Sequence, residues 1–184
     1  MAATLSAMVP IGTKAHDFLL KDVISGNNIS LYNSRGEIAS VVMFICNHCP
    51  YVIHIYNHLA KLTSDYQAKG IAFFGINSNN YQAYPDDSPD KMKSLAQELG
   101  YKFPYMIDET QNVAKQYNAT CTPDFFVFNK DLSLVYRGEY DNSRPNNGIP
   151  VTGNSLQLAL DALISGQIPN HNQIPSIGCN IKWR

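Results

Sequence analysis

Two cysteines three positions apart, Cys46 and Cys49, are the residues best suited to do chemistry, and His48 lies between them. Cys46 directly follows an apolar run that ends at Ile45, and Pro50 is typical of the first turn of a helix. At such a junction, unpaired backbone N–H groups and the helix dipole stabilise a thiolate. A protonated His48 would favour it further. The motif predicts reversible dithiol–disulfide chemistry, with Cys46 attacking and Cys49 resolving the intermediate.

The same motif can also be half of a zinc site or an inert pair, and two nearby histidines bear on that alternative. His54 and His58 are four residues apart, a spacing at which two helical side chains can share a metal ion. The apolar residues Val52, Ile55 and Leu59 mark a different face of that helix as buried. No second close pair of cysteines or histidines completes a tetrahedral set. The sequence therefore predicts neither a metal nor a cofactor.

Strands must hold this motif in place. Three apolar runs, Ile38–Ile45, Ile71–Ile76 and Phe125–Phe128, lack alternation and predict strands covered on both faces. The segment Leu134–Tyr140 alternates apolar and charged residues, Arg137 among them. It predicts a hairpin partner for Phe125–Phe128, with one wetter face.

Helical periodicity appears between and after these runs. Apolar residues at steps of three and four predict helices over 52–66 before Gly70, from Ser88 to Gly100, and from the cap Asn154 to Gly166. The stretch 112–117 predicts at most a short helix. The range 38–76 is therefore a βαβ unit. The segments Asn77–Asp87 and Gln167–Arg184 are long without periodicity, and we expect both beside the active site.

Composition restricts the class of protein. The 184 residues are 45% hydrophobic and 16% charged, which predicts one globular domain over 1–184. The net charge of -1 and the scattered basic residues predict no nucleic-acid partner and no membrane association. Neither a signal peptide nor a membrane-spanning run is evident, which predicts a cytoplasmic protein. Four cysteines are too few for a disulfide scaffold, so redox or catalytic use is favoured. The oligomeric state is not predicted.

Seven segments together are typical of one family: Cys46–Val52, Asn77–Asn79, Tyr84–Pro89, Cys121–Phe126, Tyr136–Gly138, Asp141–Pro145 and Pro175–Trp183. Through them the chain resembles the peroxiredoxin-like branch of the thioredoxin superfamily, which is grouped with alkyl hydroperoxide reductase and thiol-specific antioxidant proteins. The resemblance covers nearly the whole chain. It implies an α/β thioredoxin fold, with a central mixed β-sheet flanked by helices. It also implies an N-terminal β-hairpin extension around Asp17–Leu31 and a long C-terminal tail, 167–184, packed near the active site.

The resemblance also implies where further site residues lie. The thioredoxin fold places a cis-proline before a central strand and opposite the CxxC motif, which implies a cis bond between Thr122 and Pro123. Cys121 and Cys179 fall in two of the seven segments. Each is either a resolving cysteine or a small buried side chain. Arg144 is either a loop salt-bridge partner or an anion-binding group near the thiolate.

One departure concerns peroxide chemistry. Peroxiredoxins carry a proline, a Thr or Ser four residues on, the peroxidatic cysteine three further on, and an arginine that polarises the peroxide. With Cys49 in the peroxidatic place, Cys46 stands in the Thr place and Val42 in the proline place. If Cys46 is instead the peroxidatic residue, the proline and the Thr or Ser are again missing. Arg137 and Arg144 are the candidate substitutes for the arginine. Because the proline and the Thr or Ser are missing in both registers, efficient peroxidase activity is not expected.

Three functions follow. The favoured one is a thiol–disulfide oxidoreductase with an antioxidant role, which acts on a disulfide-bearing protein or a small thiol. The second is a divergent peroxidase, in which Cys46 or Cys49 reduces a hydroperoxide and Cys121 or Cys179 resolves the product. The third is a non-catalytic thioredoxin-fold binding module. A low thiol pKa at Cys46 would favour the enzymes.

Overall fold

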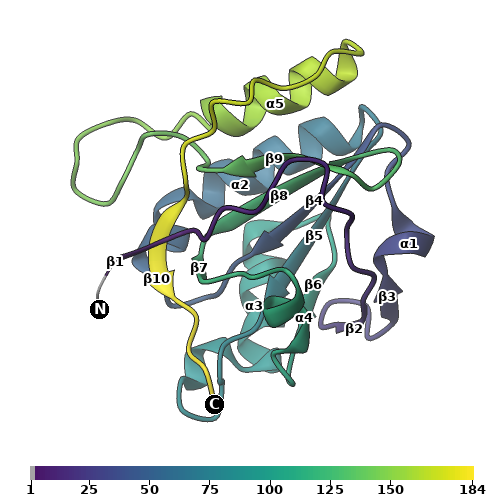
Figure 1. Ribbon diagram of the computed structural model, residues 1–184. Coiled ribbons are helices and arrows are strands. Elements are labelled where there is room, and N and C mark those ends of the chain that lie inside the picture. The colour runs from purple at the N-terminus through teal and green to yellow at the C-terminus, as the bar shows by residue number, and fades with distance from the viewer. Residues whose placement is uncertain (1–2) are drawn as a thin grey trace.

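The computed structural model describes residues 3–184, which form an α/β structure (Figure 1). Its helices are α1 (Leu31–Ser34), α2 (Pro50–Gln67), the 3₁₀ helix η1 (Pro85–Asp87), α3 (Pro89–Leu99), α4 (Asn112–Gln116) and α5 (Asn154–Ile164). Its strands are β1 (Ala3–Leu5), β2 (Leu19–Asp22), β3 (Asn28–Ser30), β4 (Ala39–Phe44), β5 (Ile71–Asn77), β6 (Tyr105–Ile107), β7 (Cys121–Thr122), β8 (Asp124–Asn129), β9 (Leu134–Gly138) and β10 (Ile177–Asn180). Within residues 3–184, no helix has the length and apolar character needed to span a membrane.

Seven strands form a mixed sheet in the order β3-β2-β6-β5-β4-β8-β9. Strands β4 and β5 are parallel, with Ala39 opposite Ile71, and α2 connects them as the expected βαβ unit. Strand β8 is antiparallel to β4 and forms a hairpin with β9. Strands β2 and β3 form the expected N-terminal hairpin, which joins the sheet where β2 pairs with β6. The predicted mixed sheet flanked by helices is confirmed.

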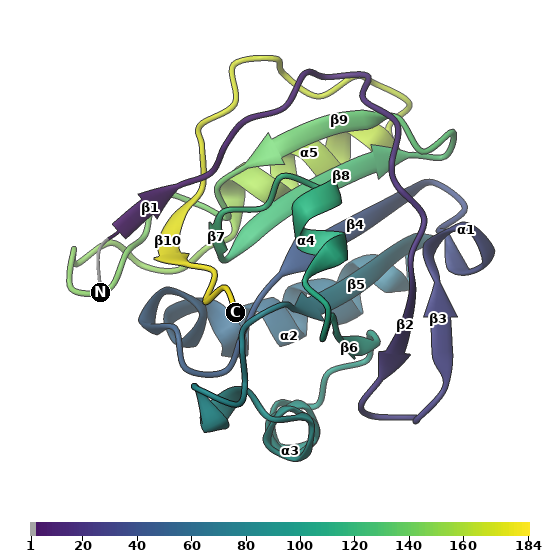
Figure 2. The same ribbon diagram turned by 60° about the horizontal axis from the view of Figure 1, so that its bottom comes forward.

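Helices cover both faces of this sheet, so its central strands are buried (Figure 2). On one face, α2, α3 and α5 pack around Val41 and Met43 of β4. On the other face, α4 and the segment around Phe18 pack around Val42 and Phe44. Successive side chains of a strand point to opposite faces, so an unbroken apolar run supplies both cores.

Two helix boundaries show how the loops fix the ends of helices. Helix α3 starts after Ser88 and ends at Gly100, whose φ of 68° is the left-handed C-cap that glycine adopts without strain. Helix α5 starts one residue earlier than predicted, because its N-cap is Gly153 and Asn154 is already helical. The carboxylate of Asp141 accepts hydrogen bonds from the backbone N–H of Gly153 and of the residue before it, at 2.6 and 2.7 Å. It thereby satisfies free donors at the helix start.

The prediction of a wetter face on β9 is wrong. Arg137 is fully buried, and its guanidinium donates to the carboxylate of Asp124 at 2.9 Å. It also donates to the backbone carbonyls of Ala7 and Asn118. The guanidinium carbon lies 4.2 Å from the centre of the Phe126 ring. A charge with this many partners can face the core, which alternation alone does not reveal.

A second sheet of three strands, in the order β1-β10-β7, brings distant segments together. Figures 1 and 2 show β1 and β10 side by side at one edge of the molecule. Strand β10 pairs with β7 so that Cys179 is opposite Thr122. A Cβ atom on Gly178 would lie 1.9 Å from the carbonyl oxygen of Thr122, so this close approach requires glycine. Part of the tail therefore lies against the Thr122-Pro123 segment.

Candidate active site

Cys46 and Cys49 lie at the junction of β4 and α2. Strand β4 ends at Phe44 and α2 begins at Pro50, so Cys49 is the N-cap residue. Its side chain is therefore at the end of the helix where free backbone N–H groups concentrate positive charge. Both cysteines are free thiols and are buried, with exposures of 1% and 0%. A substrate can reach them only when a covering segment moves.

Thr122 contacts both thiols. Its hydroxyl oxygen is 3.4 Å from Cys46 Sγ, and its carbonyl oxygen accepts a hydrogen bond of 3.1 Å from Cys49 Sγ. The peptide bond between Thr122 and Pro123 is cis, which confirms the expected cis-proline. The structure thus brings together Cys46, Cys49, Thr122 and Pro123.

Cys179 approaches the same place from the tail. It is buried in β10, directly opposite Thr122. Both Cys179 and Cys46 are close enough to the Cys49 sulfur to influence its pKa. Cys49 is therefore the middle member of three neighbouring thiols.

The pKa values of the two motif cysteines shift in opposite directions. A hydrogen bond from the Cys46 thiol outweighs burial and, with donors from Cys179 and Val52, lowers the pKa of Cys49 to about 5. Burial raises the pKa of Cys46 well above its usual value, and the contact with Cys49 and the charge of Asp87 raise it further. These directions favour a thiolate at Cys49 over the predicted Cys46, and the position of Cys49 at the helix N-terminus acts in the same sense.

One contact opposes a thiolate at Cys49. A carbonyl oxygen only accepts, so the oxygen of Thr122 can bond to Cys49 only in the thiol form. The neighbouring thiols of Cys46 and Cys179 act in the opposite sense and lower the pKa of Cys49.

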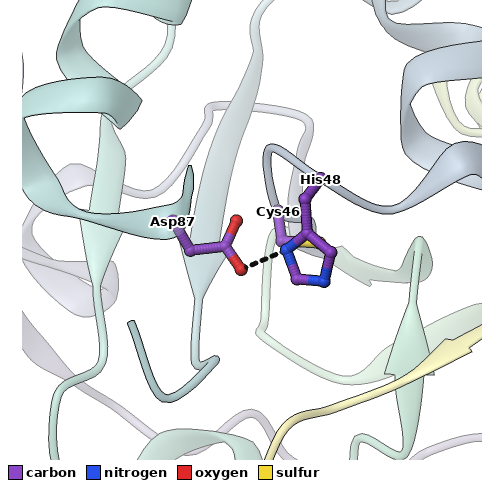
Figure 3. Close-up of side chains that lie close together, drawn as sticks. All are labelled: Cys46, His48 and Asp87. Atoms are coloured by element: carbon purple, nitrogen blue, oxygen red, sulfur yellow. Dashed lines mark hydrogen bonds and ion pairs between the residues drawn. The ribbon is translucent and has the colours of Figure 1, made fainter. Parts of the chain in front are cut away.

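His48 and Asp87 form an acid–base pair beside Cys46, with the imidazole Nδ1 2.7 Å from the carboxylate (Figure 3). The carboxylate of Asp87 also accepts hydrogen bonds from the Asn47 backbone and the Asn79 side chain, both at 2.8 Å. Burial acts to raise the pKa of Asp87, but these hydrogen bonds and His48 outweigh it and lower the pKa. The hydrogen bond to Asp87 raises the pKa of His48. A protonated imidazole is thereby favoured next to the thiols.

The rest of the His48 ring packs against a neighbouring side chain, but its second nitrogen makes no hydrogen bond to the described residues. Its Nε2 atom is buried and has no hydrogen-bond partner among residues 3–184. The ring stacks on Tyr84, with centres 5.3 Å apart and planes 9° from parallel. Tyr84 and Asp87 both belong to Asn77–Asp87, and their contacts confirm that this segment lies beside the site. Asp87 was not predicted as a site residue, and its only signal in the sequence was its place in a family-like segment.

Cys46, His48 and Asp87 could also act as metal ligands, since one donor atom from each lies within 4.8 Å of the others. Thiolate, imidazole and carboxylate together suit zinc. Both Asp87 oxygens already accept hydrogen bonds, which an ion would have to displace. His54 and His58 are not in this group, and each bonds instead to a hydroxyl oxygen, at 3.0 and 2.6 Å.

Arg144 and Cys121 have partners other than the motif thiols. Arg144 forms an ion pair with Glu139 and donates to the carbonyl oxygen of Asp141. It is thus a loop salt-bridge partner, the first of its two predicted roles. The thiol of Cys121 contacts the carbonyl oxygen of Pro123 at 3.8 Å, and burial raises its pKa.

A small cavity of about 20 Å³, room for about one water molecule, lies beside the cis-proline. It is bounded by the start of α2, the loop before α5 and the tail. Its lining residues are Tyr51, His54, Ile55, Pro123, Glu139, Tyr140, Asp141, Ser143, Arg144, Pro145, Ser176 and Ile177. The cavity offers both apolar and charged surface next to the residues that cover the thiols.

The mixed sheet, the CxxC motif at a helix start and the opposing cis-proline define a thioredoxin-fold protein. Residues 11–137 match the AhpC/TSA family, and the chain belongs to this family. The resemblance found in the sequence is thereby confirmed. Among curated proteins, none matches the chain.

Solved structures share this fold. An uncharacterized conserved protein from Geobacillus kaustophilus is 55% identical, with a TM-score of 0.98 over 100% of this chain and 97% of that one. A hypothetical protein from Sinorhizobium meliloti 1021 is 44% identical, with a TM-score of 0.96 over 98% of each chain. The peroxidoxin BcpB from Mycobacterium tuberculosis is 16% identical, with a TM-score of 0.62 over 85% of this chain and 96% of that one, and it shares the fold.

Proposed function

We propose that the protein is a thiol–disulfide oxidoreductase whose Cys46–Cys49 pair cycles between dithiol and disulfide. The Cys49 thiolate attacks a substrate disulfide, forms a mixed disulfide and releases one substrate thiol. Cys46 then attacks the Cys49 sulfur, which releases the second substrate thiol and leaves the Cys46–Cys49 disulfide. An external thiol reductant restores the dithiol.

The observation that carries this proposal is geometric: Cys49 is the N-cap of α2, and Thr122 lies 3.4 Å from the Cys46 sulfur and 3.1 Å from the Cys49 sulfur. The pKa of Cys49, lowered to about 5, supports it. At neutral pH a group with that pKa is almost entirely thiolate, which is the nucleophilic form. Its partner thiol already lies beside it, so ring closure requires little movement. His48 adds a positive charge nearby when it is protonated.

The proposed substrate is a disulfide-bearing protein or a small disulfide, and the proposed compartment is the reducing cytoplasm. The thiol–disulfide chemistry of the motif supports this choice of substrate, because a thiolate attacks disulfide sulfur. The low net charge of -1 gives no support for a polyanionic partner such as nucleic acid.

Reduction of insulin disulfides by dithiothreitol, with and without the protein, tests the proposal. Cys49→Ser is expected to abolish the catalysed rate, because it removes the thiolate. Cys46→Ser is expected to lower it by roughly tenfold or more, because the neighbouring thiol no longer closes the disulfide. Cys121→Ser is the matched control and should leave the rate unchanged.

Peptide mapping after oxidation by glutathione disulfide supplies the outcome that would contradict the proposal. If the wild-type chain forms no Cys46–Cys49 disulfide, the proposed function is wrong. If Cys49→Ser keeps a thiol that alkylates at low pH and Cys46→Ser does not, the function stands but the thiolate belongs to Cys46.

Peroxide reduction is less well supported, because neither candidate arginine is free to polarise a peroxide. Arg137 is fully buried against Asp124, and Arg144 is paired with Glu139. Mass spectrometry after one equivalent of hydrogen peroxide discriminates between the functions. A sulfenic acid that forms at Cys49 faster than at a free thiol would favour the peroxidase.

A further inference from the structure

A thiol, an imidazole and a carboxylate meet beside the cysteine motif. One donor atom from each of Cys46, His48 and Asp87 lies within 4.8 Å of the other two, and Figure 3 shows the three side chains together. The β4–α2 junction supplies the thiol and the imidazole, and η1 supplies the carboxylate. The ligand atoms of a tetrahedral zinc ion lie about 2.0–2.3 Å from it and roughly 3.5 Å from one another. Small side-chain movements therefore suffice to close these three donors around one ion.

Neighbouring residues already orient two of these donors. The carboxylate of Asp87 accepts hydrogen bonds of 2.8 Å from the backbone N–H of Asn47 and from the side chain of Asn79. The His48 ring stacks on Tyr84, and its Nδ1 atom faces Asp87 at 2.7 Å. In metal sites, outer contacts of this kind fix the orientation of the ligating ring and carboxylate. Much of the order that an ion would require is therefore present without it.

The chemistry of the donors selects the class of ion. Magnesium and calcium take oxygen ligands, so a set with one sulfur and one nitrogen does not suit them. Zinc accepts thiolate, imidazole and carboxylate alike. Three protein ligands around zinc commonly leave a fourth position to water or to a substrate. The set therefore suits a divalent cation of the zinc class, held in an open site.

We propose that the reduced chain binds one divalent cation of the zinc class through Cys46, His48 and Asp87. The thiol proton and the proton shared by His48 and Asp87 leave to solvent, and the sulfur, a ring nitrogen and a carboxylate oxygen bind the ion. The donors from Asn47 and Asn79 shift to the lone pairs of the carboxylate that remain, because a carboxylate has about four acceptor sites. Nothing is oxidised or reduced in this step.

The position of Cys49 separates this site from a simple dithiol chelate. Within residues 3–184, the group of neighbouring donor atoms does not include Cys49. Its thiol donates instead to the carbonyl oxygen of Thr122 at 3.1 Å. A chelate made by the CxxC motif alone would need both cysteines and neither His48 nor Asp87. The proposed site needs one cysteine together with the imidazole and the carboxylate.

The ion and the disulfide compete for the same sulfur, an effect that rests on the proposed function. To form the disulfide, the Cys46 sulfur leaves the ion and attacks the Cys49 sulfur. The bond between Cys49 and the substrate sulfur then breaks, and the substrate leaves as a thiolate. The substrate disulfide is the oxidant, and the ion returns to solvent as a divalent cation. A bound ion therefore slows disulfide formation, and oxidation of the motif releases the ion.

Titration of the fully reduced, full-length chain with Co²⁺, followed by displacement with Zn²⁺, tests the site. The wild type is expected to bind one Co²⁺ per chain with a thiolate-to-metal charge-transfer band, which Cys46→Ser should lack. His48→Gln and Asp87→Asn should each weaken binding by at least the roughly 10–100-fold that loss of an outer-shell partner causes. Cys49→Ser is the matched control, and it should keep both the band and the one-to-one stoichiometry.

Two results would overturn the proposal. One is a wild type that binds no Co²⁺ in one-to-one amount. The other is loss of the charge-transfer band in Cys49→Ser with retention of full affinity in His48→Gln and Asp87→Asn, because that pattern belongs to a dithiol chelate. Thermal unfolding without metal confirms that each variant is folded. His48→Gln changes a side chain that is 14% exposed and decides the question if Asp87→Asn is unfolded.

The link to the redox cycle is measured separately. One equivalent of Zn²⁺ should slow formation of the Cys46–Cys49 disulfide by glutathione disulfide, and His48→Gln should relieve this inhibition. An unchanged rate in zinc-loaded wild type would overturn the link. If the metal-free wild type forms no such disulfide, the proposed function fails, whereas the Co²⁺ spectra decide the metal site independently.

Discussion

The carboxylates of Asp124 and Asp87 are both fully buried in ion pairs, and they respond to burial in opposite ways. In the region between β8 and β9, Arg137 and Asp124 both have side-chain exposures of 0%. Burial raises the pKa of Asp124 in spite of the guanidinium beside it. At the start of α2, His48 keeps 14% of its side chain exposed. There, hydrogen bonds outweigh burial and lower the pKa of Asp87.

The difference shows what distinguishes a structural pair from a chemically useful one. A guanidinium does not lose its proton in a protein, so Arg137 holds one charge state and fixes the strands around it. An imidazole can lose or gain a proton near neutral pH, and His48 has an unpartnered ring nitrogen with which to do so. The pair beside the cysteines is therefore the one able to respond to pH.

The largest expected effect comes from breaking the structural pair. Arg137→Met leaves Asp124 buried without a countercharge and is expected to lower the free energy of unfolding by about 3–5 kcal/mol. Urea denaturation at about pH 8 measures it, and the loss should be smaller at about pH 5, where an unpaired Asp124 can take up a proton.

The control for that measurement is Lys61→Met, which breaks an exposed pair and should change the stability by about 0–1 kcal/mol. A loss of less than about 1 kcal/mol in Arg137→Met would show that the two buried pairs do not differ as argued.

A smaller effect is expected at the active-site pair. Asp87→Asn removes the negative charge and one of the two oxygens that together accept three hydrogen bonds, and it should lower the free energy of unfolding by about 1–3 kcal/mol. It should also lower the pKa of Cys46, because the Asp87 charge raises it. The pH dependence of Cys46 alkylation in a Cys49→Ser background measures this shift. An unchanged Cys46 profile would contradict the electrostatic link.

His48→Gln should change the pH dependence of stability more than its size. The pKa of His48 is raised from 6.5, so its contribution is fully present below about that pH and is lost as the pH rises through the folded value. The pKa of Asp87 is lowered from 3.8, so its contribution is lost as the pH falls through its folded value. The stability difference between wild type and His48→Gln should therefore be largest between these limits. A difference that grows with pH would be inconsistent with a raised pKa.

The smallest effect is expected from Tyr84→Leu, which removes the ring stacked on His48. Loss of a stacked pair of this kind should lower the free energy of unfolding by about 0.5–1.5 kcal/mol. The position of the His48 signals in an NMR titration distinguishes loss of packing from loss of the ion pair. A Tyr84→Leu effect as large as that of Asp87→Asn would place the stack, not the ion pair, at the centre of the site.

Local patterns predicted the elements that hold the motif. The helical steps of α2, the caps of α3 and the apolar runs of β4, β5 and β8 are each determined within a few neighbouring residues. The short strands β1, β6, β7 and β10 were not predicted, because two to four residues are too few for a periodicity. They exist through pairing with strands distant in the sequence.

The chemistry of the site was predictable only in part. Residue types and spacing identified Cys46 and Cys49, and family-like segments identified Thr122 and Pro123. The direction of the thiol pKa shifts was not predictable, since it depends on which groups surround each sulfur in the folded chain. The pairing of Asp87 with His48 and the burial of Arg137 were not predictable either, because both depend on residues that are distant in the sequence.

The three-stranded sheet has a consequence for how the molecule folds. It joins Ala3 to Cys179, which come from opposite ends of the described chain, and Cys179 to Thr122. Contacts that close long loops form slowly, because the entropy of the intervening chain must be lost first. The active site should therefore be among the last regions to become ordered, and until then its thiols are open to reaction with any oxidant in their surroundings.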